Sequence, residues 1–416
     1  MFRYVLPSLA ALIMGVSTLI ISNSALAQVP LTLPETVNIA LGANDPSVAL
    51  LEQEALAYED RAIADSQLPD PTLRAQIANF PLSSFDYNRE AMTQLKFGIS
   101  QKLPKGQTLS LTRDKRTAQA QTSRAQKTLR ERQIVLDARL AWLELYYWRE
   151  ARKLTLESQQ KVGELGSVAE TVYASGRSSL QDVLRIELET TELGTKLIDI
   201  DRNEDIARAN LERLLGRFDG AREIVTNFPV LPPVLSEGTI RDKLAAHPSI
   251  RVYDARIETR SRDVDIAAEQ YKPGFSVDAQ YGLRDSRSDF GSIGVSVSMP
   301  IFSKTNKNYA LSAAKRMRAS QTLGRDAQVL ELERSLRREW AQYTRFGERI
   351  MLYETDVLDR AKETRDAAMT AYGNKLADFS ELVRSELAVL GIELTLARLR
   401  IDRVKAQANL LYLSGE

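Results

Sequence analysis

Apolar residues along this chain follow two different periods. Over long stretches they recur at spacings of three and four, as Leu336, Trp340, Tyr343 and Phe346 do, with charged residues on the other faces. This spacing predicts amphipathic helices that pack as in a coiled coil. In four short segments apolar residues instead alternate with polar ones, which predicts strands with one apolar and one polar face. The chain is therefore predicted to be mainly helical, with four strands.

The predicted strands are 72–80, 92–103, 274–283 and 290–299. In the last of them, "GSIGVSVSMP", Ile293, Val295 and Val297 alternate with serines and a glycine. Lengths of about nine to twelve residues suit a tilted strand that crosses a bilayer, and the alternation suits a barrel with an apolar exterior and a wet lumen. A soluble sandwich with a solvated outer face is the alternative.

The helices differ greatly in length. They are predicted at 36–68, 106–172, 180–215, 238–271, 303–371 and 378–413. At 1.5 Å per residue, a helix of about 68 residues is ~100 Å long. In each half of the chain the two shorter helices together equal that length, so we expect them to stack end to end beside the long helix, on either side of the strand pair.

The two halves of the chain repeat one plan. Pro46 corresponds to Pro248 at an offset of 202 residues, and "YASGRSSLQDVLRIE" from Tyr173 corresponds to "YGNKLADFSELVRSE" from Tyr372 at an offset of 199. The ends of the halves, "ANLERLLG" and "ANLLYLSG", also correspond. We therefore predict a tandem duplication. Its parts are a first structural repeat over 28–226, a linker over 227–238 and a second repeat over 239–416.

Each repeat has a helix break at the same place. Gly176 is a plausible C-cap of the first long helix, and Ser179 with Asp182 resembles a capping box that starts the next helix. Asp378 and Glu381 occupy the matching positions in the second repeat. These breaks predict two tight helical hairpins whose tips lie at the end of the rod opposite the strands.

The first 27 residues have the pattern of a secretory signal peptide. Arg3 is followed by an apolar run and by Ala25-Leu26-Ala27, an A-x-A cleavage site. An uncleaved membrane anchor is the alternative. The chain contains no cysteine, which excludes disulfides, thiolate metal sites and a lipidated N-terminal cysteine.

Charge and hydropathy narrow the function further. The chain has 56 Lys and Arg against 55 Asp and Glu, and only Arg3 is charged within 1–27, so the rest balances at 55 of each. This balance argues against a nucleic-acid partner. After residue 27 no run approaches the ~20 apolar residues of a membrane-spanning helix, so we expect any membrane contact to come from the strands.

Four strands are too few to close a membrane barrel, because known barrels begin at about eight strands. The chain is therefore expected to combine strands with copies of itself. A dimer would give eight strands and a cyclic trimer twelve. The trimer alone aligns six helical hairpins around a pore wide enough to be a duct.

The sequence resembles the TolC family of outer-membrane efflux ducts. The resemblance covers essentially the whole chain after the signal peptide, through the duplication, the strand pairs, the entry "LPDPTL" and the hairpin motifs quoted above. It implies a mainly α fold with a transmembrane β-barrel portion, in which a homotrimer forms a 12-stranded barrel in outer-membrane lipid and an α-barrel in the periplasm of a Gram-negative cell. The stretches "LPDPTLRAQIANFP" and "GISQKLPKG" are most similar to the heavy-metal branch of CzcC and CusC type.

The resemblance also implies partners and a site. The duct would dock on a periplasmic adaptor protein and an inner-membrane pump of the RND type, with its closed aperture just inside the hairpin tips. The implied adaptor contacts are Gly176, Arg177, Ser178, Ser179, Asn374, Lys375 and Leu376. The implied aperture residues are Asp378, Glu381 and Arg384, where some relatives carry two aspartates one turn apart. A Glu–Arg pair at those positions weakens a purely acidic ring and could instead hold the aperture shut.

No residues for catalysis or a cofactor are evident. The sole histidine, His247, precedes Pro248 at a predicted helix start, and neither a metal-ligand cluster nor a phosphate-binding loop occurs. The sequence thus predicts a passive duct that exports heavy-metal cations, with multidrug efflux and type I secretion as alternatives of the same architecture. A periplasmic coiled-coil adaptor or scaffold is the competing class. The loops 81–91 and 284–289 are expected to face the exterior.

Overall fold

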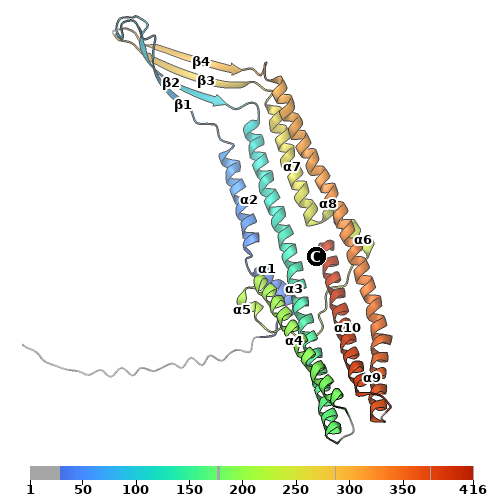
Figure 1. Cartoon of the computed structure of the whole chain (residues 1–416). Helices are drawn as coiled ribbons and strands as arrows, with labels where there is room; N and C mark the ends of the chain where they lie inside the picture. Colours follow the sequence, from blue (N-terminus) through green and yellow to red (C-terminus); the bar gives the residue numbers. More distant parts are fainter. Residues whose placement is uncertain (1–28, 176–178, 286, 375, 416) are drawn as a thin grey trace, which may run out of the picture.

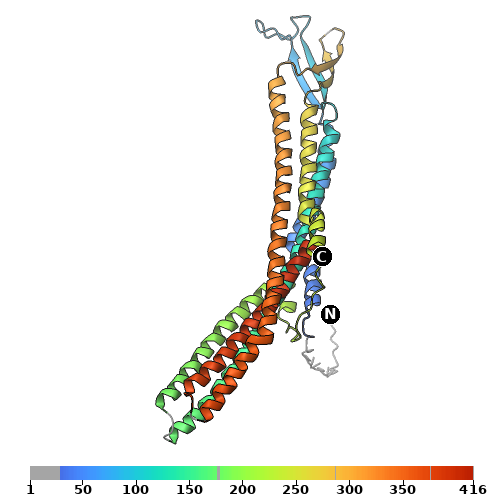
Figure 2. The same ribbon diagram turned by 90° about the vertical axis from the view of Figure 1, so that its right-hand side faces the viewer.

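The computed structural model describes residues 29–175, 179–285, 287–374 and 376–415 as a long rod, with a β-sheet at one end and two helical hairpins at the other (Figure 1). Seen from the side, the half of the rod that carries the hairpins is inclined to the half that carries the sheet (Figure 2). The predicted signal peptide, 1–27, lies outside the described residues. The predicted separation of strands and hairpin tips is confirmed.

The elements follow the predicted order in both halves of the chain. The first half contains α1 (Leu33–Gly42), α2 (Pro46–Ala64), β1 (Thr72–Ala78), β2 (Gln94–Leu103), α3 (Thr108–Ala174), α4 (Leu180–Leu215) and α5 (Arg217–Gly220). The second half contains α6 (Glu237–Lys243), the 3₁₀ turn η1 (Leu244–Ala246), α7 (Pro248–Glu269), β3 (Gly274–Leu283), β4 (Phe290–Ser298), α8 (Lys304–Leu352), the π-helical turn η2 (Tyr353–Val357), α9 (Leu358–Gly373) and α10 (Phe379–Ser414). The four predicted strands are confirmed, and α4 spans its predicted range.

The predicted continuous helices 36–68 and 238–271 are wrong, because both are broken before a proline. Asp45 caps α2, and its carboxylate accepts the backbone N–H of Ser47 at 2.8 Å. His247 caps α7 just before Pro248. Proline has no N–H to donate and disfavours helical geometry in the residue before it, so each proline begins a new helix.

The predicted uninterrupted helix 303–371 is also wrong in one respect. The five residues of η2 form a π-helical turn between α8 and α9. Such turns are mostly single insertions within α-helices, and apolar periodicity does not reveal them. No helix in the described ranges has an apolar stretch long enough to cross a membrane.

The short helices stack along the long ones as predicted. α2 packs against the part of α3 nearer the sheet, and α4 packs against the part nearer the tip (Figure 1). α7 and α10 are arranged in the same way along α8 and α9. Helix α3 also contacts both α7 and α10, so it joins the first repeat to the second.

Three clusters of buried apolar side chains hold the rod together. The largest surrounds Trp142, whose ring stacks on Tyr146 and whose indole N–H donates to the carbonyl of Leu31 at 3.2 Å. A second lies near the hairpin tips, and a third joins α6 and α7 to α8 and to the end of α10. The third cluster contains Leu336 with Trp340 and Tyr343 packed against it, which confirms the predicted packing stripe.

Equivalent helices of the two repeats end on glycines in unusual conformations. Gly216 after α4 has φ 82°, and Gly415 after α10 has φ 86°. A side chain at positive φ is strained, whereas glycine adopts this region freely. The repeated "ANL…G" ending therefore corresponds to a positive φ in both repeats, although ψ is 159° at Gly216 and 19° at Gly415. The domain boundaries at 227 and 238 stay a prediction.

The four strands form one antiparallel sheet in the order β1-β2-β3-β4. Both predicted strand pairs are present, and β2 also pairs with β3, which joins the repeats. The register aligns Leu73, Ile99, Ala279 and Ile293 in one row across all four strands. Alternate rows are apolar in this way apart from Gln101, which is paired with Val277, so the sheet has one mainly apolar face and one mainly polar face.

Candidate functional site

The ends of the two hairpins lie side by side at the tip of the rod (Figures 1 and 2). Among the predicted adaptor contacts, Ser179, Asn374 and Leu376 are described, and the Leu376 side chain is 82% exposed. The remaining predicted contacts, Gly176, Arg177, Ser178 and Lys375, lie outside the described residues, as does the predicted C-cap role of Gly176. The described tip residues are available to a partner.

The two hairpins begin their returning helices differently. The Ser179 hydroxyl accepts the backbone N–H of Asp182, and the Asp182 carboxylate accepts the N–H of Ser179, each at 3.3 Å. The predicted capping box of α4 is thus confirmed. Asp378 is the N-cap of α10, but its side chain accepts no capping bond. The matching capping box predicted for Asp378 and Glu381 is wrong, because the Glu381 carboxylate turns instead to Arg384.

The three predicted aperture residues lie on the first turns of α10. Arg384 donates to the Glu381 carboxylate at 2.5 Å, and the two side chains are 63% and 50% exposed. An exposed pair within one helix contributes a few tenths of a kcal/mol. Within the described part of the chain Asp378 has no ion pair. Among the described residues, Asp378 therefore presents a negative charge that no ion pair compensates, and the Glu381–Arg384 pair lies within α10 and does not join the two hairpins.

The second apolar cluster packs next to the tip region and stabilises it. Phe379 is buried and meets the ring of Tyr372 edge-on, with ring centroids 5.1 Å apart. Between α3 and α4, an added Cβ at Gly166 would stand 3.0 Å from the Ile186 side chain. Close packing on both hairpins sets the position of the exposed tip residues.

Glu386, which the sequence analysis missed, ties three helices together behind the predicted aperture residues. Its side chain is 7% exposed and lies 3.3 Å from Lys161 on α3 and 3.8 Å from Arg365 on α9. The sequence did carry a signal, because Glu386 falls between Val383 and Leu390 in the row of buried apolar residues of α10. A carboxylate at such a position requires a cationic partner from a neighbouring helix.

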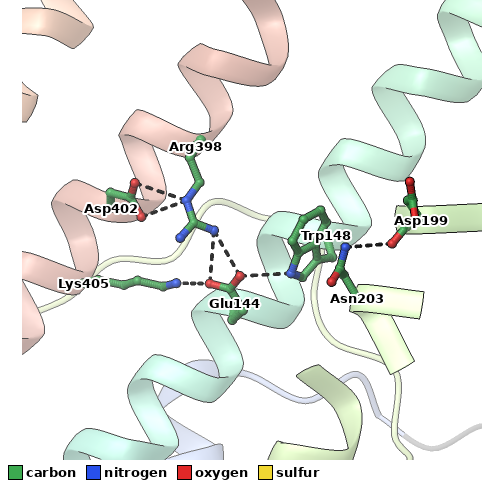
Figure 3. A network of polar contacts seen from close by, with 7 residues as sticks. All are labelled: Glu144, Trp148, Asp199, Asn203, Arg398, Asp402 and Lys405. Carbon is green, nitrogen blue, oxygen red and sulfur yellow. Dashed lines mark hydrogen bonds and ion pairs between the residues drawn. The ribbon is translucent and has the colours of Figure 1, made fainter. Parts of the chain in front are cut away.

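A larger polar network joins the repeats farther up the rod (Figure 3). The Glu144 carboxylate on α3 accepts from Lys405, from Arg398 at 3.0 and 3.2 Å, and from the indole N–H of Trp148 at 2.9 Å. Arg398 also donates to Asp402. Burial by itself raises the pKa of Glu144, but Lys405 and Arg398 together hold that pKa below its usual value. The network thus fixes α10 against α3.

The sheet at the other end has its polarity reversed relative to a soluble protein. Large apolar side chains on one face are widely exposed, including Ile293 at 84% and Leu73 at 77%. On the opposite face Gln94 is buried, and along β3 the polar residues are less exposed than their apolar neighbours. Contiguous exposed apolar surface of this kind marks contact with a membrane or a partner.

No metal site is present among the residues that the structure describes, since no group of three or more His, Asp and Glu side chains could hold an ion there. His247 is buried, and its Nδ1 accepts the backbone N–H of Ser249 at 3.2 Å. Its place in the fold is the start of α7, as the sequence predicts.

Comparison with known proteins identifies solved structures that are similar to this one. No protein-family model matches the chain, and no curated protein matches it. Among solved structures, a membrane protein from Pseudomonas aeruginosa has a TM-score of 0.80 at 16% identity, over 92% of this chain and 90% of that one. CusC has a TM-score of 0.76 at 13% identity, over 93% and 92%. The outer membrane protein VceC of Vibrio cholerae has a TM-score of 0.75 at 17% identity, over 92% and 96%.

Likeness at such low identity over nearly the full length of both chains establishes the fold. The fold predicted from the resemblance to the TolC family is therefore confirmed. The chain has the long helical hairpins and the four-stranded sheet of these proteins.

Proposed function

We propose that this chain is the outer-membrane duct of a tripartite efflux pump. The observation that carries the proposal is the sheet, which has one apolar and widely exposed face and one polar face. A barrel built from such sheets turns its apolar face to lipid and encloses a wet lumen. The helices then extend from the outer membrane into the periplasm.

The open edges of the sheet support a homotrimer. β1 and β4 are the outer strands and have no partner on one side within the described chain. Exposed strand edges pair readily with another chain. In the proposed ring β4 of one protomer pairs with β1 of the next, and closure after three copies gives twelve strands and six hairpins.

The exposed hairpin tips support contact with an adaptor and an inner-membrane pump, which we propose to be of RND type. Ser179, Asn374 and Leu376 would contact the adaptor, together with the predicted contacts outside the described residues. Asp378, Glu381 and Arg384 would line the closed aperture, with the uncompensated carboxylate of Asp378 directed toward its counterparts in the trimer.

Two measurements test the duct itself. Outer-membrane fractions should contain the protein as a trimer that dissociates on heating, and the purified protein should conduct ions across a planar lipid bilayer. An exclusively soluble periplasmic monomer that lacks conductance would refute the duct and favour the coiled-coil adaptor or scaffold.

The cargo is tested separately. Heavy-metal cations are the cargo that the sequence resemblance predicts, and CusC is among the structures similar to this one. A deletion strain should be compared with its complemented strain on copper, silver, zinc, cobalt and cadmium salts and on lipophilic drugs. Sensitivity to metals alone would support the heavy-metal branch. Sensitivity to drugs alone would keep the duct and overturn that cargo.

A further inference from the structure

The polar face of the sheet carries an excess of positive charge. The strand register places Arg74 on β1 and Lys96 and Lys102 on β2 on this face, with Asp278 on β3 as its acidic residue. Lys105, just after β2, belongs to the same surface, because its side chain passes within 3.5 Å of where a Cβ on Gly274 would stand. The polar face of each chain thus carries four basic residues and one acidic residue.

These positive charges are not neutralised locally. None of the four basic side chains forms an ion pair with any residue in the described ranges. Arg74 and Lys102 are exposed on the polar face, whereas Asp278 is only half-exposed. The base of the sheet adds to the excess, since Lys307 on α8 is buried, its Nζ lacks a hydrogen-bond partner among the described residues, and its charge repels that of Lys105.

Glycines let the uncharged and acidic side chains lie flat against the sheet. A Cβ on Gly294 would stand 2.1 Å from the Asp278 carboxylate, and a Cβ on Gly98 would stand 3.0 Å from Gln280. Asp278 therefore lies across the neighbouring strand instead of extending toward the axis of a barrel. The exposed basic side chains determine the potential in the space above this face.

We propose that the lumen of the barrel is electropositive and admits anionic solutes in preference to cationic ones. This inference rests on the proposed trimeric duct, in which the net charge of three per chain becomes nine around one enclosed passage. Low-dielectric walls lined with one sign of charge focus the field and raise the local concentration of counter-ions about 10-fold or more. The favoured cargo is a carboxylate, a phosphate or another anionic organic solute, and a metal would pass as an anionic complex.

The absence of cysteine from the sequence permits a direct test. Ser100 lies on the polar face opposite Asp278, so S100C places a single thiol in the proposed lumen. We would measure its rates of modification by anionic sulfonatoethyl and cationic trimethylammonium-ethyl methanethiosulfonate in proteoliposomes. Relative to a free thiol, the ratio of anionic to cationic rates should rise about 10-fold. It should fall toward the free-thiol value in 1 M salt, where the Debye length is about 3 Å.

Charge variants in the S100C background sharpen the test. K102Q alone, and R74Q/K96Q/K102Q/K105Q together, should lower the rate ratio stepwise, while D278N should raise it. R345Q is the matched control, because Arg345 is exposed on α8 beside Glu348, far from the sheet, and it should leave the ratio unchanged.

The outcomes separate this inference from the proposed function. If the rate ratio for S100C equalled that of a free thiol and neither K102Q nor D278N changed it, the electropositive lumen would be overturned. The proposed duct would stand. If neither reagent modified S100C in the folded protein, although both modified it after denaturation, the polar face would not line a water-filled lumen. The proposed duct would then fail, and this inference with it.

Discussion

Replacement of Glu144 by glutamine should loosen the contact between the two repeats. In the folded chain this carboxylate accepts hydrogen bonds from Lys405 and Arg398 on α10 and from Trp148 on its own helix. Glutamine keeps the shape and one acceptor oxygen, so the bond from Trp148 is retained. The change removes the negative charge between two cations.

The magnitude follows from the surroundings of the two cations. The Lys405 side chain is 18% exposed, and Glu144 is its partner in the ion pair, so E144Q leaves a largely buried ammonium without a counter-ion. Arg398 is 38% exposed and keeps Asp402 at 3.0 Å, so its share of the loss is small. Hydrogen bonds to charged groups contribute about 1.5–3 kcal/mol. We expect E144Q to lower the free energy of opening between α3 and α10 by about 2–3 kcal/mol.

Hydrogen exchange measured by mass spectrometry on the detergent-solubilised protein is the assay. Since about 1.4 kcal/mol corresponds to a factor of ten, exchange in peptides covering 396–408 should accelerate roughly 30- to 150-fold at pH 7. E150Q is the matched control. Glu150 lies on the same helix, and its contact with Lys153 is 3.9 Å long, so the change should stay within about 0.5 kcal/mol.

The pH dependence gives an independent check. The folded pKa of Glu144 is held below the ordinary value of 4.5. Its contribution is therefore complete above pH 4.5 and is lost as the pH falls through the folded pKa. The difference in exchange between the natural protein and E144Q should narrow below pH 4.5. Equal acceleration by E144Q and E150Q, or a difference that does not depend on pH, would refute the reasoning.

Three further predictions concern other parts of the molecule. On the apolar face of the sheet, I293K should reduce the amount of trimer in outer-membrane fractions, because a lysine facing lipid costs about 2–4 kcal/mol at the bilayer midplane. S292K on the polar face should assemble normally. E386Q removes a buried charge that pairs with side chains of two other helices, so trypsin should cut the hairpin tips of this variant at lower enzyme concentrations than those of the natural protein. E381Q, which changes an exposed pair, should be cut like the natural protein. Equal digestion of both variants would contradict the assigned role of Glu386. Burial lowers the pKa of His247, so thermal melts of the natural protein should show a loss of stability as the pH falls below about 6.5, the ordinary histidine pKa. H247N keeps a capping side chain and should lack this loss of stability. Identical pH profiles for the two proteins would refute the prediction.

Much of the fold follows from local signals in the sequence. Apolar spacing of three and four predicts α3 and α10, and alternation predicts all four strands with their faces. The duplication identifies equivalent breaks. The sequence also contains the two prolines, Pro46 and Pro248, before which the helices are interrupted. Apolar periodicity alone does not mark either break, because the apolar stripe continues on both sides with little change.

Several contacts of the candidate site could not be predicted from local sequence patterns. The Glu381 carboxylate could complete a capping box with Asp378 or pair with Arg384. The two arrangements require different rotamers of Glu381, whose energies differ by only a few tenths of a kcal/mol. The contacts of Glu386 with Lys161 and of Glu144 with Lys405 join residues more than 200 positions apart, and many glutamates in the helices have the same local context. Pairing between β2 and β3 likewise requires the two repeats to align along their whole length.

The sequence by itself determined the repeated plan, the lengths of α3, α4 and α10 and which residues of each strand share a face, because these depend on interactions between near neighbours along the chain. Only the tertiary structure decided that Arg74, Lys96 and Lys102 share the polar face of the sheet with a half-exposed Asp278. The physical reason is that register and charge compensation arise between strands and helices distant in sequence, where one-dimensional spacing carries no information about which side chains meet.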